Sequence, residues 1–134
     1  MNLVDSLAGA IAKFEGFYKT GSLAQRNNNP GNLRTWGSTP TSGGYAVFPT
    51  LDAGWAALKR QIQINIDRGL TMYEFFAGKS GVYPGYAPAA DSNEPYHYAR
   101  TVASWIGVDP STTLKSVQAG ESPSPPLAEP PGKC

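Results

Sequence analysis

The spacing of the large apolar residues is the feature that most limits how this chain can fold. In three segments these residues recur every three or four positions: Val4, Leu7, Ile11 and Phe14; Trp55, Leu58, Ile62 and Ile66; Tyr98, Val102 and Trp105. This spacing places them on one face of a helix. A glycine, the residue that most often ends a helix, follows each segment. The sequence therefore predicts three amphipathic helices around one core.

Residues that stabilise helix starts support this division. Thr50 is placed to cap the second helix, and Thr71–Glu74 matches a capping box that opens a short additional helix. Ser92 or Asn93 is predicted to cap the helix that contains Tyr98, and Asp109–Leu114 to form one further helical turn.

The segment between the first two helices is predicted to contain a β-hairpin. Asn32–Trp36 and Gly44–Pro49 have strand-like composition, and the polar stretch between them suits a loop. At 134 residues the chain has the size of one domain. We expect a predominantly α-helical α+β domain over residues 1–117 and a proline-rich flexible tail or linker over residues 118–134.

Charge and composition exclude several classes of function. The net charge of +1 disfavours a nucleic-acid binder, and no apolar run reaches the roughly 18 residues of a membrane span. The N-terminus does not resemble a signal peptide, so we expect a cytosolic protein, one exported by another route, or part of a larger protein. We expect a monomer.

Cysteine and histidine are too scarce for several kinds of site. The chain has one of each, Cys134 and His97. An intramolecular disulfide, a structural zinc site or a Cys–His nucleophile pair is therefore not expected, and we predict neither a metal nor a cofactor. Any catalysis must use carboxylates, amides, hydroxyls and arginines.

Glu15 is the candidate catalytic residue. It lies at the predicted end of the first helix, between Phe14 and Phe17 and at the flank of the apolar face. The negative end of the helix dipole and burial both raise the pKa of a carboxyl group. A carboxyl that keeps its proton near neutral pH is suited to general acid catalysis. The alternative is a half-exposed surface glutamate.

Amides and tyrosines supply candidate substrate-binding residues. The loop "NNNPGNLR" carries Asn32 and Arg34 into the first predicted strand, and their donors and acceptors suit sugar hydroxyl and N-acetyl groups. Tyr86, Tyr98 and Asn93 lie in a later tyrosine-rich segment, which suits a cleft that holds sugars. The alternatives are that the loop is a turn whose polar side chains have no binding role, and that Tyr98 is a core residue.

Four segments together resemble the lysozyme-like superfamily, in particular the lytic transglycosylase-type proteins of phages and prophages. They are "FEG" (Phe14–Gly16), the turn Asn29–Asn32, "FPTLDAGWAAL" (Phe48–Leu58) and "YAPAADSNEPYHYARTVASWIGV" (Tyr86–Val108). The resemblance covers Leu3 to Leu114, most of the chain.

The resemblance implies a fold, a substrate and site residues. It implies an α-rich fold with a small hairpin beside a cleft, and glycan strands of N-acetylmuramic acid and N-acetylglucosamine as the substrate at the bacterial cell wall. It also implies that Glu15 is the catalytic acid, with Asn32, Tyr45, Asn93 and Tyr98 as cleft residues. Gly16 departs from the soluble bacterial transglycosylases, which usually have serine after the glutamate, whereas many phage muramidases have glycine.

The number of carboxyl groups bears on the reaction. Hydrolysis of a glycosidic bond normally uses two, whereas a transglycosylase uses one. Asp52, Asp67 and Glu74 fall at helix ends or in a cap, and Asp91 is the best remaining second candidate. We therefore favour the one-carboxyl reaction. The alternatives are a hydrolytic muramidase, a non-catalytic wall-binding or virion structural module with this fold, and a helical adaptor that binds a protein.

Overall fold

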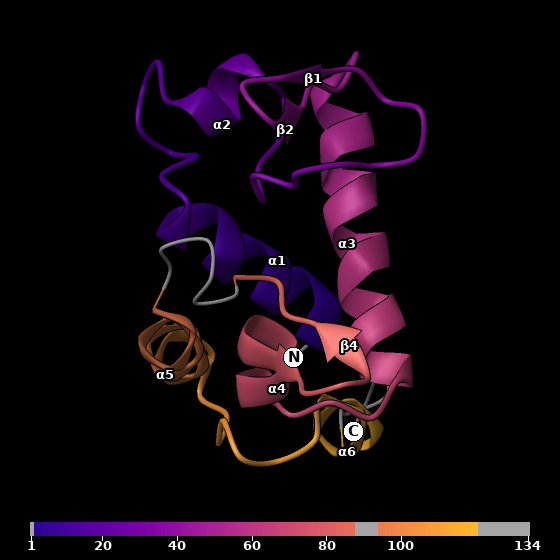
Figure 1. The fold of residues 1–134 in the computed structure, drawn as a ribbon. Coiled ribbons are helices and arrows are strands. Elements are labelled where there is room, and N and C mark those ends of the chain that lie inside the picture. The colour runs from indigo at the N-terminus through magenta and orange to yellow at the C-terminus, as the bar shows by residue number, and fades with distance from the viewer. Residues whose placement is uncertain (1, 88–93, 121–134) are drawn as a thin grey trace, which may run out of the picture.

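A computed structural model describes residues 2–87 and 94–120, and these form a predominantly helical α+β fold with two small antiparallel sheets (Figure 1). The expectation of a mainly α-helical α+β chain is confirmed. The elements are α1 (Leu3–Phe14), α2 (Leu23–Arg26), β1 (Thr41–Ser42), β2 (Tyr45–Ala46), α3 (Leu51–Asp67), α4 (Met72–Ala77), β3 (Gly78–Lys79), β4 (Tyr83–Pro84), α5 (Pro95–Ile106) and α6 (Leu114–Ala119). Within the described residues, no helix is long and apolar enough to cross a bilayer.

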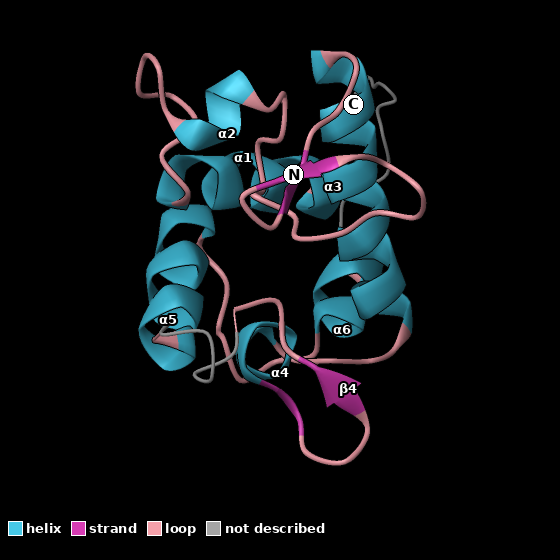
Figure 2. Ribbon diagram, turned by 45° about the horizontal axis from the view of Figure 1, so that its top comes forward, coloured by secondary structure: helices cyan, strands magenta, loops and turns pink. Residues whose placement is uncertain are grey.

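The main core lies between α1, α3, α4 and α5. Helix α1 packs against both α3 and α5, and α4 packs against α5 (Figure 1 and Figure 2). The predicted apolar faces supply the fully buried side chains, among them Leu7, Ile11, Leu58, Ile62, Ile66 and Val102. Val4, Phe14 and Trp55 are only partly buried, and 43% of the Trp105 surface is exposed. A second cluster, Leu33, Ala46, Phe48 and Ala57, joins the loop and hairpin to α3.

The helix ends follow the local sequence in most places. The Thr50 hydroxyl accepts from the Ala53 amide at 3.1 Å, and Thr71 and Glu74 form the predicted capping box. Helix α5 ends at Gly107, whose φ of 76° is left-handed. The predictions for two other helix starts are wrong.

Helix α5 begins at Pro95 with Glu94 as its N-cap, so neither Ser92 nor Asn93 holds that position. Proline is favourable there because its fixed φ already suits the first helical turn. The last helix starts at Leu114 after Thr113 as N-cap, later than the predicted turn over Asp109–Leu114. The Asp109 carboxylate instead accepts from the Ser111 amide at 2.8 Å, which stabilises a turn. Helix α6 runs to Ala119, and residues 121–134 lie outside the described part.

The hairpin exists, but its first strand is not the predicted one. Gly43 and Gly44 have φ values of 60° and 86° and form a two-residue turn that pairs Ser42 with Tyr45. The predicted strand Asn32–Trp36 is a loop because Asn32 is left-handed, with a φ of 48°. The second small sheet, β3 with β4, was not predicted.

Asn29 fixes the loop that precedes the hairpin. Its side chain is fully buried, and its Nδ2 donates to the carbonyls of Leu33 at 2.9 Å and Ala46 at 3.0 Å. Its Oδ1 accepts from the Leu33 amide at 2.9 Å. These bonds substitute for a strand pairing and satisfy backbone groups that burial would otherwise leave without partners.

We expect Asn29→Ala to lower the free energy of unfolding by about 2–4 kcal/mol, because it removes three hydrogen bonds between a buried side chain and the backbone. Urea denaturation measures this loss. Asn27→Ala is the matched control: Asn27 is also buried, but its Nδ2 has no partner in the described structure. Equal losses in the two variants would show that the bonds of Asn29 do not hold the loop.

Candidate active site

Glu15 lies at the end of α1 as its C-cap. Its amide donates to the Ile11 carbonyl at 2.9 Å, so the residue still follows the helix while its side chain leaves at the C-terminal end. Gly16 then turns the chain with a φ of 79°. The Glu15 side chain is only partly exposed.

Two side chains from distant parts of the chain donate to the Glu15 carboxyl group. The Tyr98 hydroxyl, from α5, donates to Oε2 at 2.6 Å. The Asn32 Nδ2, from the loop before the hairpin, donates to Oε1 at 3.2 Å. The fold thus brings together Glu15, Asn32 and Tyr98, three of the residues that the sequence analysis selected.

Packing fixes the position of the Tyr98 hydroxyl. The Tyr98 ring is stacked between Phe14, at a centroid distance of 3.8 Å, and Phe76, at 4.2 Å. The residue is 3% exposed. The core role of Tyr98 is therefore confirmed, and its hydroxyl also bonds to the candidate residue Glu15.

Burial dominates the electrostatics of Glu15. Desolvation raises the pKa of the carboxyl above its ordinary value, although the hydrogen bonds from Tyr98 and Asn32 lower it. The direction predicted from the sequence is confirmed. Burial also raises the pKa values of the Tyr86 and Tyr98 hydroxyls, and the nearby Glu15 charge adds to both effects. Both phenols therefore remain neutral over the pH range in which Glu15 titrates.

Asn32 is suited to both protonation states of Glu15. Its Nδ2 donates to the carboxylate, while its Oδ1 is buried and has no partner in the described structure. Rotation of the amide by 180° would present Oδ1, which can accept a hydrogen bond from the protonated carboxyl. The same side chain can thus bond to Glu15 before and after proton transfer.

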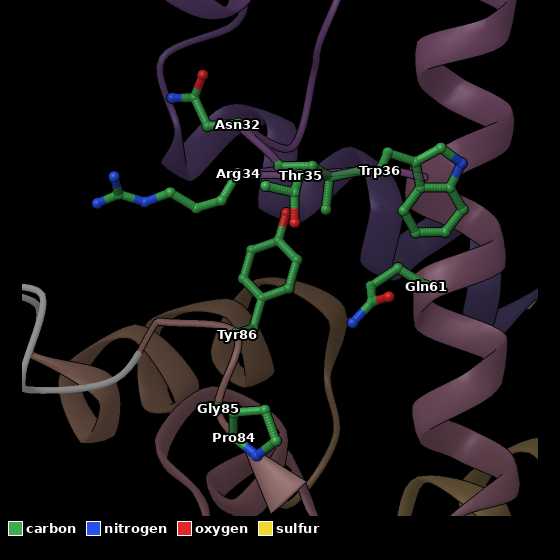
Figure 3. Close-up of a pocket in the computed structure, with 9 residues that line it drawn as sticks. Asn32, Arg34, Thr35, Trp36, Gln61, Pro84, Gly85 and Tyr86 are labelled. Carbon is green, nitrogen blue, oxygen red and sulfur yellow. The ribbon is translucent and has the colours of Figure 1, made fainter. Parts of the chain in front are cut away.

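A pocket of about 330 Å³ adjoins Asn32 (Figure 3). Its wall combines the loop, α3 and the segment after β4, and the lining residues are Asn32, Leu33, Arg34, Thr35, Trp36, Gln61, Pro84, Gly85 and Tyr86. Tyr86 points from the lower segment toward the loop, and its hydroxyl donates to the Gly31 carbonyl. Gln61 reaches from α3 toward the same space.

Only some of the other predicted site residues line the pocket. Arg34 lines the pocket, and its guanidinium lies 4.6 Å from the centroid of the Tyr45 ring. Tyr45 is not among the described residues that line the pocket, and it instead supports Arg34. Tyr86 lines the pocket but uses its hydroxyl within the fold. Asn93 lies outside the described residues.

No second carboxyl group joins Glu15 within the described residues. Asp5 pairs with Lys59 at 3.1 Å, Asp67 accepts from Gln63, and Glu74 closes its capping box. Asp52 and Glu94 are exposed at the starts of α3 and α5. Asp91 lies outside the described part. The described residues also contain no group of three or more His, Cys, Asp or Glu that could hold a metal ion.

Sequence reasoning missed Gln61, Trp36 and Gly31. Gln61 directly precedes Ile62 of the buried face, so its place at the edge of that face was an available signal. Gly31 was interpreted only as part of a turn. A Cβ atom at this position would lie too close to the Tyr86 hydroxyl and to Leu58, so a side chain there would require both of these side chains to shift.

We expect Tyr98→Phe to raise the pKa of Glu15 further, because it removes a hydrogen bond to the carboxylate and keeps the stacked ring. Carbon-13 NMR titration of the Glu15 carboxyl measures the pKa. Tyr45→Phe is the control, since the Tyr45 ring contacts Arg34. A lower pKa in Tyr98→Phe would contradict this geometry.

We expect Glu15→Gln to be more stable than the wild type at neutral pH. A raised pKa means that the folded state binds the proton more tightly than the unfolded state, whose pKa is near 4.5. This stabilisation is complete below the unfolded pKa and is lost as the pH rises through the folded pKa, whereas glutamine does not ionise. The difference in unfolding free energy, measured in urea at several pH values, should therefore grow with pH. A difference that shrinks would contradict the burial effect.

Comparison with known proteins identifies no relative of this chain. No family model, curated protein or solved structure matches the chain. The function must therefore be argued from the residues of the site and from the sequence resemblance.

Proposed function

We propose that the protein has a lysozyme-like fold and cleaves the β-1,4 bond between N-acetylmuramic acid and N-acetylglucosamine in peptidoglycan, as a lytic transglycosylase with Glu15 as its only catalytic carboxyl. One observation carries the proposal: Glu15 is buried, its pKa is raised, and it is bonded to Asn32 at the edge of a pocket. The identity of the substrate is inferred from the sequence resemblance.

In the first step Glu15 acts as the acid. Its raised pKa keeps the proton on the carboxyl, which transfers it to the glycosidic oxygen as the bond to the anomeric carbon breaks. The resulting carboxylate is stabilised by the Tyr98 hydroxyl and the Asn32 amide, both of which donate to it.

In the second step Glu15 acts as the base. The carboxylate removes the proton from the C6 hydroxyl of the muramyl residue, and that oxygen attacks the anomeric carbon to close a 1,6-anhydro ring. The proton from the C6 hydroxyl replaces the one that Glu15 gave to the leaving oxygen, so the cycle needs neither water nor a second carboxyl. This agrees with the absence of a second carboxyl beside Glu15 in the described residues.

Two other sequence interpretations are tested by the same products. A hydrolytic muramidase would use a second carboxyl, and Asp91 is its candidate. A non-catalytic wall-binding or virion structural module would bind glycan without cleaving it.

We expect the purified protein to release muropeptides with 1,6-anhydro-muramic ends from peptidoglycan, as measured by mass spectrometry. Glu15→Gln should lower the rate by about 10²–10⁴-fold because it removes the transferable proton. Glu74→Gln is the control, since Glu74 serves the cap of α4. Reducing ends that carry the mass of water would favour hydrolysis. Binding without any cleavage would favour the module.

A further inference from the structure

Gly9 has no structural explanation within α1. It lies in the interior of the helix, where glycine is less favourable than alanine, and its φ is not left-handed. A Cβ atom at this position would meet no atom within 4 Å, so the fold does not require glycine there. Glycine leaves the surface of α1 open at this position.

A hollow of about 450 Å³ borders Gly9 on the side of α5. Its lining residues are Ser6, Gly9, Ala10, Lys13, Trp105 and Ile106. The Trp105 ring is 43% exposed, and it is held by Phe14 at a centroid distance of 6.1 Å. The Lys13 ammonium lies 4.2 Å from the centroid of the same ring. This hollow therefore has a fixed and accessible aromatic wall.

A second hollow of about 390 Å³ borders Gly9 on the side of α3. Its lining residues are Asp5, Ala8, Gly9, Tyr18, Asp52, Trp55 and Lys59. Tyr18 is 61% exposed, and both Tyr18 and Trp55 pack edge-on against Phe17. Gly9 belongs to the walls of both hollows, so they meet where α1 has no side chain.

The charges of the two hollows identify the kind of ligand that fits. Lys13 and Lys59 contribute two positive charges and Asp5 and Asp52 two negative ones, which sum to zero. A nucleic acid requires a positive surface, and an amphipathic helix requires a continuous apolar groove. Exposed aromatic rings beside balanced polar groups suit the apolar faces and hydroxyl groups of an uncharged sugar polymer.

We propose that the two hollows form a second, non-catalytic glycan-binding surface, with the strand crossing α1 at Gly9 between Trp55 and Trp105. The identity of the glycan as a β-1,4-linked amino-sugar strand rests on the proposed function. Gly9 and Glu15 are six residues apart on α1, about 120° around the helix, so the surface and the catalytic carboxyl face different directions. The surface would hold the enzyme on its polymer between cleavage events.

The chain contains three tryptophans, and each reports on one of the spaces described above. Trp36 lines the pocket beside Asn32, Trp55 lines the α3-side hollow, and Trp105 lines the α5-side hollow. The probe is a soluble β-1,4-linked hexamer of N-acetylglucosamine. It is added to the full chain carrying Glu15→Gln, which prevents turnover, and the three indole N–H signals are followed by NMR.

We expect the signals of Trp55 and Trp105 to shift together, with one affinity. Adding Gly9→Leu should weaken that affinity about tenfold or more and leave the Trp36 response unchanged, because leucine fills the point where the hollows meet. Trp105→Ala should weaken it similarly. Lys115→Leu, on α6, places an equal side chain on a helix that borders neither hollow and should have no effect.

The remaining outcomes separate the two proposals. A shift of Trp36 alone would overturn the second surface and leave the proposed function intact. Shifts of Trp55 and Trp105 without a Trp36 response, and without cleavage by the wild type, would support the surface and reject the proposed function. Shifts that depend on protein concentration and not on the hexamer would assign the surface to a second copy of the chain, which would overturn its role in glycan binding.

Discussion

The stack of Phe14, Tyr98 and Phe76 is the interaction on which the rest of the structure depends. It joins α1, α5 and α4 through ring contacts at 3.8 and 4.2 Å, and its central ring carries the hydroxyl that donates to Glu15. The same burial that stabilises the core therefore removes water from the carboxyl and raises its pKa. Core packing and the raised pKa of Glu15 have one physical origin in this protein.

The asparagines of the loop have two different roles. Asn29 is buried and replaces a strand pairing with three side-chain hydrogen bonds, which hold the loop to β2. Asn32 adopts a left-handed backbone and turns its amide toward Glu15. The first residue makes the loop rigid, and the second uses that rigidity to place a hydrogen-bonding group beside the carboxyl.

The aromatic residues fall into a buried group near Glu15 and an exposed group away from it. Tyr98 and Phe76 are buried near Glu15, Trp36 lines the adjoining pocket, and Trp105 is exposed outside it. The exposed Trp105 belongs to the surface that we propose binds glycan, whereas the buried rings belong to the core beside Glu15.

The sequence by itself determined the helices and several of their ends. The spacing of Leu58, Ile62 and Ile66 and the capping box of Thr71 and Glu74 depend on residues within one or two helical turns, so local sequence is sufficient for them. The position of Glu15 at the flank of an apolar face is local in the same sense, and it predicted the direction of the pKa change.

Only the tertiary structure decided which polar groups meet. Tyr98 and Asn32 reach Glu15 across 83 and 17 residues, whereas Tyr83 lies against Arg68 and Tyr96 against Tyr73. Helical spacing places Tyr98 on an apolar face, but nothing local indicates that its hydroxyl meets Glu15. The exposure of Trp105 likewise follows from the packing of α5 against α1. Such choices depend on long-range packing, which a helical period does not encode.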